Sequence, residues 1–159
     1  MKERQCFPCS ACCEGWLTTK INGVQVMPGK PCVHATEQGC GIYAKRPHNP
    51  CVIFKCGWLQ GLHDMPEHMR PSEAGAIVIF NRLWHGREVI RAVPTGEEIP
   101  ADTLEWLMAL SKKLSLPLLF SEHEFKDGRF IGKKKLGYGP PSFIEAVKTE
   151  PGPDDVFML

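Results

Sequence analysis

All eight cysteines of this 159-residue chain lie between Cys6 and Cys56, and the longer part of the chain that follows contains none. A chain that used cysteine as an ordinary small core residue would scatter it, so this distribution indicates one dedicated role for the thiols. Thiolates are ligands for metal ions and iron–sulfur clusters. The candidate ligands are Cys6, Cys9, Cys12, Cys13, Cys32, Cys40, Cys51 and Cys56.

Three of these thiols recur at every third residue, at Cys6, Cys9 and Cys12. Bacterial ferredoxins begin their cluster-binding run with the same C-x2-C-x2-C spacing and complete it with a fourth cysteine. Structural zinc sites more often combine one C-x2-C pair with a second pair elsewhere. The spacing therefore favours an iron–sulfur cluster, and zinc is the alternative because it readily fills reduced cysteine sites.

The adjacent residues Cys12 and Cys13 add a constraint. Neighbouring side chains of an extended backbone point to opposite faces, so we expect these two thiols to serve different sites or different atoms of a multinuclear centre. Eight thiols suffice for two four-thiolate sites; one four-cysteine cluster with a second, partly histidine-ligated site is the alternative. We expect Cys6, Cys9 and Cys12 to share one site with a remote cysteine, and Cys13 to belong to the other.

Composition limits the partners and the compartment. The net charge of +1 and the pI of about 7.6 argue against a large basic surface for nucleic acid, and no apolar stretch is long enough to span a membrane. The N-terminal residues lack the apolar region of a secretory signal peptide, so we expect a cytoplasmic protein. In that reducing compartment clustered cysteines usually bind metal; a disulfide scaffold on a trimmed fragment is the alternative. Metal ions are the expected partners, and a protein partner or small substrate is left open.

The pattern of turn signals and apolar residues predicts an α+β fold in one compact domain. Residues 1–60 form an irregular cysteine-rich metal-binding lobe, and residues 61–159 form a scaffold of hairpins and helices packed on it. Asn22-Gly23 predicts a small hairpin within the lobe. The scaffold is expected to contain strands at 76–83 and 87–93, a hairpin of 118–125 with 129–131, and a short helix after Pro141-Ser142.

A longer helix is expected to begin at Asp102, with Glu105 as its capping-box partner, and to end before Pro117. Its predicted core stripe consists of Leu104, Leu107, Met108 and Leu114.

Several residues near the cysteines are secondary candidates. His34, His48 and His63 are close enough in sequence to be substitute ligands or hydrogen-bond donors, or else they are polar loop residues. Arg46, with Tyr43 three residues before it, could offset the charge of the thiolates or bind an anionic ligand. The remaining histidines, His68, His85 and His123, are expected at the surface.

The ordered set of cysteines, with Tyr43 and Arg46-Pro47 between Cys40 and Cys51, resembles the CxxCxxCC cysteine-cluster family, which is described as a zinc- or iron-chelating domain. The resemblance covers residues 6–56 and extends to Trp58 and Arg70-Pro71. It implies ligand roles for the eight cysteines alone. A related motif occurs in flagellin lysine methylases, but this chain is much shorter and shows no cofactor-binding region of that kind, so their activity is not carried over.

The sequence thus predicts a metal-binding protein whose cysteines ligate an iron–sulfur cluster. The number of thiols is sufficient for a second metal as well. The predicted role is redox or cluster-dependent. A structural zinc module that mediates a protein interaction is one alternative. A metal-dependent enzyme is another, with His63 and Glu67 as its candidate acid or base groups.

Overall fold

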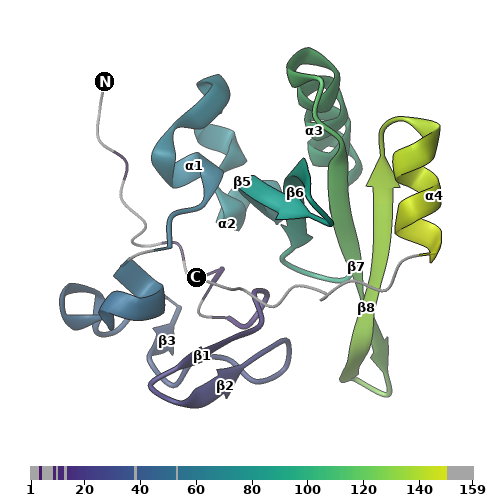
Figure 1. Ribbon diagram of the computed structural model, residues 1–159. Coiled ribbons are helices and arrows are strands. Elements are labelled where there is room, and N and C mark those ends of the chain that lie inside the picture. The colour runs from purple at the N-terminus through teal and green to yellow at the C-terminus, as the bar shows by residue number, and fades with distance from the viewer. Residues whose placement is uncertain are drawn as a thin grey trace.

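The computed structural model describes residues 4, 9, 11–12, 14–37, 39–52 and 54–149. Cys6, Cys13 and the Pro-rich tail from residue 150 onward lie outside these ranges. The chain combines a four-stranded sheet and its helices with an N-terminal lobe of short elements, as Figure 1 shows. The predicted α+β class is confirmed.

The sheet has the order β5-β6-β7-β8. Its strands are β5 (Ala76–Trp84), β6 (Arg87–Pro94), β7 (Leu118–Lys126) and β8 (Arg129–Tyr138). The two hairpins β5–β6 and β7–β8 are antiparallel, whereas β6 pairs with β7 in parallel. Parallel neighbours need a long crossover, and helix α3 (Ala101–Leu114) supplies it.

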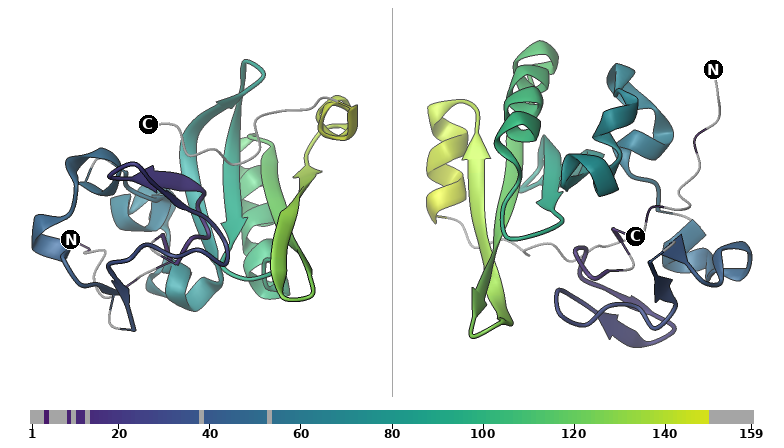
Figure 2. Two further views of the ribbon diagram at one scale, coloured as in Figure 1. Left: turned by 90° about the horizontal axis from the view of Figure 1, so that it is seen from below. Right: turned by 180° about the vertical axis from the view of Figure 1, so that it is seen from behind.

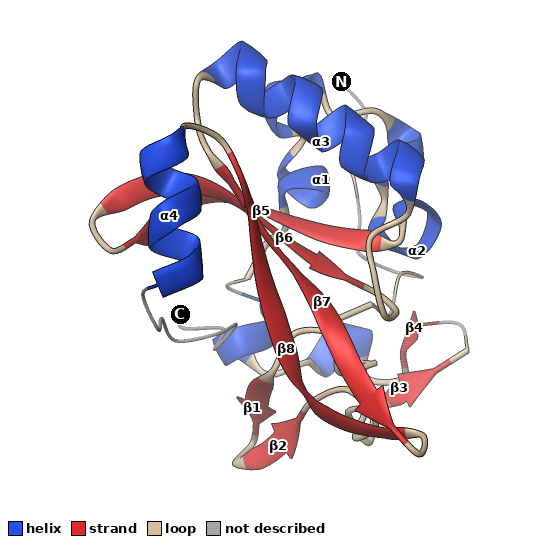
Figure 3. Cartoon of the chain, turned by 90° about the vertical axis from the view of Figure 1, so that its right-hand side faces the viewer, coloured by secondary structure: helices blue, strands red, loops and turns tan. Residues whose placement is uncertain are grey.

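The two longest helices cover opposite faces of this sheet. Leu118 and Phe120 of β7 belong to the main core, which also contains Leu107 and Leu110 of α3. The residue between them, Leu119, points to the other face, where it packs with residues of helix α4 (Pro141–Thr149). Figure 3 shows α3 and α4 on either side of the strands.

The hairpin turns lie at the predicted Asn22-Gly23 and in the gaps between the other predicted strands. Asn22-Gly23, His85-Gly86 and Asp127-Gly128 have positive φ angles at both residues, all between 49° and 78°. This is the backbone geometry of tight type I′ turns, which Asn, Asp and Gly adopt most readily. Strand β8 is longer than the predicted 129–131, because pairing with β7 along its whole length overrides the low strand preference of its glycines and lysines.

The beginning of α3 differs from the prediction. The N-cap residue is Pro100, and no side chain caps the helix. Asp102 Oδ1 instead accepts a hydrogen bond from the backbone N–H of Thr103 at 2.9 Å, and the Thr103 hydroxyl donates to the Ala74 carbonyl at 2.7 Å. The predicted Asp102–Glu105 capping box is therefore wrong, because the first turn is fixed by a contact with a distant segment.

The predicted core stripe of α3 is correct only in part. Leu107 is fully buried, and Leu110, which the prediction omitted, is buried with it. Leu104, Met108 and Leu114 are half-buried and pack against the edge of the same core.

The N-terminal lobe is built from short elements. A hairpin of β1 (Thr19–Ile21) and β2 (Val24–Val26) is followed by the two-residue strands β3 (Ala35–Thr36) and β4 (Gly39–Cys40). A 3₁₀ turn at Tyr43–Lys45, a π-helical turn at His48–Val52 and helix α1 (Gly57–Gln60) come next. The chain reaches the sheet through 3₁₀ turns at Leu62–Asp64 and Glu67–Met69 and helix α2 (Pro71–Ala74).

The lobe lies to one side of the sheet and α4 lies at the far side, as both views of Figure 2 show. Helix α1 packs on β5 so closely that a Cβ atom at Gly57 would overlap the ring of Phe80. Trp58 of the same helix is buried in the main core. A glycine at the start of α1 is therefore a packing requirement.

A second contact joins the lobe to β7. The ring of Trp16 stacks on that of His123, with the two centroids 5.4 Å apart. The His123 side chain is only 4% exposed, so the prediction of a surface position is wrong for this histidine. It is right for His68 and His85, which are exposed.

Within the part of the chain that the structure describes, no helix is long and apolar enough to cross a membrane.

Candidate metal centre

The described cysteines fall into two groups, and the first lies in the lobe. Cys32 is buried with Ile21 and Val26 in a small core of its own, and Cys51 packs against that core. Burial raises the pKa of the Cys51 thiol, and the nearby thiolates of Cys32 and Cys40 raise it further. These three thiols are thus close enough to influence one another electrostatically.

The second group lies against the main core. Cys56 is buried in that core, and the half-buried side chains of Cys9 and Cys12 pack against it. Burial is the main cause that raises the pKa of the Cys56 thiol, and Cys9 adds to the effect. The backbone N–H of Leu59 acts in the opposite direction, as expected for a thiol at the first turn of α1.

Local structure explains how the first group is gathered. The β3–β4 hairpin pairs Ala35 with Cys40, which brings Cys40 back toward the segment that carries Cys32. The backbone N–H of His34 points at Cys32 Sγ, with 3.5 Å between the two atoms. Cys51 lies in the π-helical turn, which packs against β1. Local turns therefore bring Cys32, Cys40 and Cys51 near one another, and Cys32 and Cys51 share one small core.

The path of the backbone after the cysteines of the second group requires a glycine at position 15. Gly15 follows the Cys9–Cys12 segment with a φ angle of 97°, and its N–H donates to the Cys12 carbonyl at 3.4 Å. A Cβ atom at this position would overlap the carbonyl oxygen of Met27. Only glycine combines this backbone angle with such a close approach, so Gly15 fixes how the chain leaves the first cysteines.

Within the described residues, no group of three or more His, Cys, Asp or Glu side chains is arranged to hold a metal ion. Two of the eight predicted ligands, Cys6 and Cys13, lie outside the described residues. The structure thus places six predicted ligands in two neighbourhoods without assembling a complete coordination shell.

The histidine and carboxylate candidates have other surroundings. The exposed His63 ring makes an edge contact with Phe80, with 4.6 Å between the centroids. Glu67 is exposed and forms an ion pair with Arg4, whose Nε lies 3.4 Å from Glu67 Oε1. His48 is exposed and His34 half-buried. The acid or base roles of His63 and Glu67, and ligand roles for these histidines, stay predictions.

Tyr43 and Arg46 form a compact pair beside the first group. The Arg46 guanidinium carbon lies 4.0 Å from the centroid of the Tyr43 ring, and Nη1 donates to the Tyr43 carbonyl at 2.8 Å. Its Nε donates to the Cys51 carbonyl at 3.4 Å, and the charge of Arg46 lowers the pKa of the Cys51 thiol against the effects that raise it. The sequence suggests two roles for Arg46, to offset the negative charge of the thiolates or to bind an anionic ligand. Its position beside Cys51 fits the first role.

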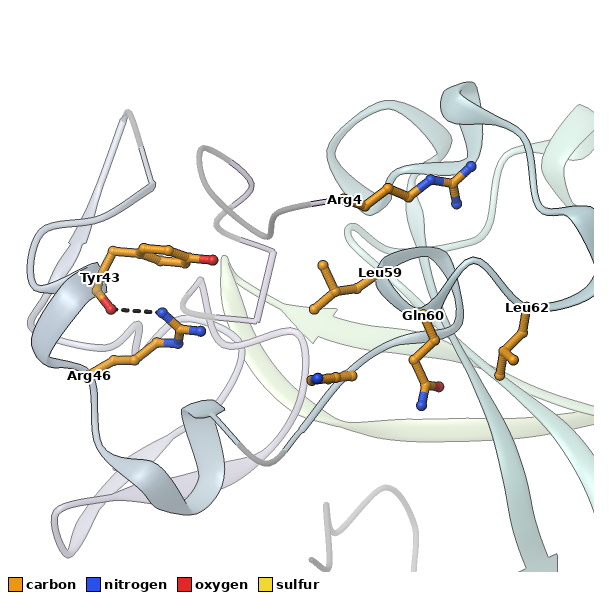
Figure 4. Close-up of a pocket in the computed structure, with 7 residues that line it drawn as sticks. Arg4, Tyr43, Arg46, Leu59, Gln60 and Leu62 are labelled. Carbon is orange, nitrogen blue, oxygen red and sulfur yellow. Dashed lines mark hydrogen bonds between the residues drawn. The ribbon is translucent and has the colours of Figure 1, made fainter. Parts of the chain in front are cut away.

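This pair lines a pocket of about 670 Å³, shown in Figure 4. The other lining residues come from the N-terminal segment and from the region of α1. Among the described residues, the lining consists of Arg4, Tyr43, Arg46, Lys55, Leu59, Gln60 and Leu62.

Two arginines pack against the ring of Trp58, an arrangement that the sequence does not predict. The guanidinium carbons of Arg4 and Arg70 lie 4.9 Å and 4.7 Å from the centroid of the Trp58 ring. Arg4 also donates to the carbonyls of Trp58 and Met65. The only signal in the sequence is that Trp58 and Arg70 belong to the stretch in which the family resemblance continues.

No family model, no curated protein and no solved structure matches the chain.

Proposed function

We propose that this chain is a cytoplasmic metal-binding protein whose eight cysteines ligate an iron–sulfur cluster and a second metal centre. The observation that carries the proposal is the division of the described cysteines into two groups, one around Cys32 and one around Cys56. The concentration of all eight thiols between Cys6 and Cys56, and the resemblance of that segment to the CxxCxxCC family, support it.

The two groups suggest two four-thiolate ligand sets. Cys9, Cys12 and Cys56 share one neighbourhood, and the regular spacing adds Cys6 to this set. Cys32, Cys40 and Cys51 share the other, which leaves Cys13 as its fourth member. This division assigns the adjacent thiols of Cys12 and Cys13 to different centres, as expected from the sequence, although Cys12 itself lies in a turn and not on extended backbone.

The surroundings of both sets fit thiolate ligands. Burial alone keeps the Cys51 and Cys56 thiols protonated, and a bound metal would supply the positive charge that stabilises their thiolate forms. The backbone N–H of His34 and the guanidinium of Arg46 are placed to stabilise negative charge on the Cys32 and Cys51 sulfurs. An iron–sulfur cluster, when bound, supplies electron transfer at a potential that such hydrogen bonds, charge and burial set.

The test is metal and acid-labile sulfide analysis, with a visible spectrum, on protein purified without oxygen. We expect iron and sulfide in nearly equal amounts. Cys32→Ser and Cys51→Ser are expected to lose the same part of the metal, while Cys56→Ser and Cys9→Ser lose a different part. Val33→Ser is the matched control, since Val33 is next to Cys32 and 80% exposed.

Two results would count against the proposal. A colourless protein that contains zinc and no sulfide, even after iron reconstitution, would identify the structural zinc module instead. If every cysteine variant lost all metal at once, the eight thiols would belong to a single centre and the division into two sets would be wrong.

A further inference from the structure

We propose that the pocket beside Arg46 binds a small organic anion, with a carboxylate or phosphate-monoester head and an apolar body. This inference concerns a site other than the thiolate centres and does not depend on which metal they hold. The pocket has a volume of about 670 Å³, which is in the range of pockets that bind small molecules.

The charge of the pocket selects an anion. Three of the described lining residues, Arg4, Arg46 and Lys55, carry a positive charge, and none of the described lining residues is acidic. Since the whole chain has a net charge of only +1, this concentration of cations is a local feature. Cations that line a concave surface raise the local concentration of anions and favour their binding.

Arg46 is the main recognition group. Its Nε and Nη1 donate to the carbonyls of Cys51 and Tyr43, and its guanidinium carbon lies over the Tyr43 ring. These contacts hold the guanidinium in place while Nη2, which makes no hydrogen bond with the described residues, can donate to a ligand oxygen. A guanidinium that is already fixed loses little conformational freedom on binding, which strengthens each hydrogen bond.

Lys55 supplies the second charge and Arg4 mainly shapes the wall. The exposed Lys55 side chain forms no ion pair with the described residues, so its ammonium group can approach a ligand. The Arg4 guanidinium is already engaged by Glu67 and by the carbonyls of Trp58 and Met65. Figure 4 shows it directed away from Tyr43 and Arg46.

The wall opposite Arg46 is partly apolar. Leu59 and Leu62 come from α1 and the turn that follows it, and in Figure 4 they lie across the pocket from Tyr43 and Arg46. Gln60 between them adds an amide that can donate or accept a hydrogen bond. An acid with an apolar body can therefore place its charged head at Arg46 and Lys55 and its body against the leucines.

The test is isothermal titration calorimetry on the purified protein, with its metal content measured on the same sample. The probes are 4-phenylbutyrate, its neutral amide, phenyl phosphate and inorganic phosphate. We expect 4-phenylbutyrate or phenyl phosphate to bind at millimolar concentration or below and the amide not to bind. The stronger of the two identifies the head group, and inorganic phosphate, which lacks an apolar body, should bind more weakly than phenyl phosphate.

Variants decide whether binding takes place in this pocket. Lys55→Met should weaken binding about tenfold, as for the loss of one charge-assisted contact. Lys126→Met is the matched control: Lys126 is an exposed lysine at the end of β7 and does not line the pocket. Arg46→Lys keeps the charge but removes the fixed guanidinium, and it should also weaken binding.

The proposal is overturned if no organic anion binds, if the amide binds as well as the acid, or if Lys55→Met and Lys126→Met bind equally well. Metal analysis keeps this outcome separate from that of the thiolate centres. Anion binding without metal would contradict the metal proposal alone, and metal without anion binding would contradict this inference alone.

Discussion

His123 is a titratable residue held neutral by its surroundings. Burial lowers its pKa from 6.5 to about 4, and the positive charges of Lys133 on β8 and Arg91 on β6 act in the same direction. Its Nδ1 lies 2.7 Å from the Gly96 carbonyl oxygen, to which it donates as the neutral tautomer. Its Nε2 is buried without a hydrogen-bond partner among the described residues. Trp16 and Phe130 contact the ring itself.

We therefore expect the free energy of unfolding to fall as pH is lowered from about 6.5 to about 4. In this interval the unfolded chain binds a proton at His123 and the folded chain does not, so acid favours unfolding. The loss between pH 7 and pH 5 should be at most about 2 kcal/mol. Urea unfolding at both pH values measures it, and His123→Gln should reduce the difference.

His85→Gln is the control for this prediction. His85 lies in the tight turn between β5 and β6. Its side chain is exposed, and its ring contacts that of Trp84. Its replacement should leave the pH dependence as it is. Equal pH dependence in wild type and His123→Gln would show that His123 does not carry the effect.

Among the elements, α4 forms a small core of its own with one face of the sheet. Phe143 is fully buried there, and its ring meets Trp84 edge-on with 5.7 Å between the centroids. Gly137 of β8 allows this close packing, since a Cβ atom at that position would lie 3.0 Å from Phe143. None of the described cysteines belongs to this core.

Phe143→Ala should destabilise the protein by about 3–5 kcal/mol, the usual cost of removing a buried phenylalanine. The metal content per folded molecule should not change, because Cys9, Cys12, Cys32, Cys51 and Cys56 pack in or against the other two cores. Urea unfolding combined with metal analysis measures both quantities. Ser142→Ala, at an exposed position in the same helix, is the control. A loss of metal in folded Phe143→Ala protein would contradict the separation of the cores.

The elements also show what a single sequence can predict. Turns were predictable because Asn22-Gly23 and Asp127-Gly128 determine their backbone geometry locally. The start of α3 was not, because the hydroxyl of Thr103 binds the carbonyl of Ala74 in a distant segment. The buried position of His123 was missed for the same reason, since Trp16 covers it from the lobe. The spacing of the cysteines predicted ligand types but not which remote thiols become neighbours.

At the scale of the whole molecule, the described cysteines lie in two parts that differ in the size of their cores. The first group lies in a lobe of two- and three-residue strands with only a small core, whereas the sheet has long strands and a large core. Elements with few buried apolar contacts open at low free energy. If the thiolate centres are loaded as proposed, metal ligation contributes a larger share of the stability in the lobe than in the sheet.

Removal of the metal with a chelator should therefore increase amide hydrogen exchange first in residues 14–52, while β6 and β7 stay protected. Hydrogen–deuterium exchange with mass spectrometry, before and after chelation, measures this difference. Reloading with metal is the control and should restore the protection. A uniform increase across the chain would contradict the prediction, because it would mean that the lobe and the sheet unfold as one unit.

The contact of the lobe with β7 has a consequence for synthesis on the ribosome. Trp16 precedes Cys56 in the chain, whereas its partner His123 lies on β7, which is complete only at Lys126. At typical translation rates, synthesis from Cys56 to Lys126 lasts roughly 4 to 14 seconds. All eight thiols have been synthesised before β7, whose His123 stacks on Trp16 of the lobe, is complete. If the thiolate centres are loaded as proposed, delivery of metal competes with oxidation of the thiols during that interval, and the supply of metal to the nascent chain then affects the yield of correctly loaded protein.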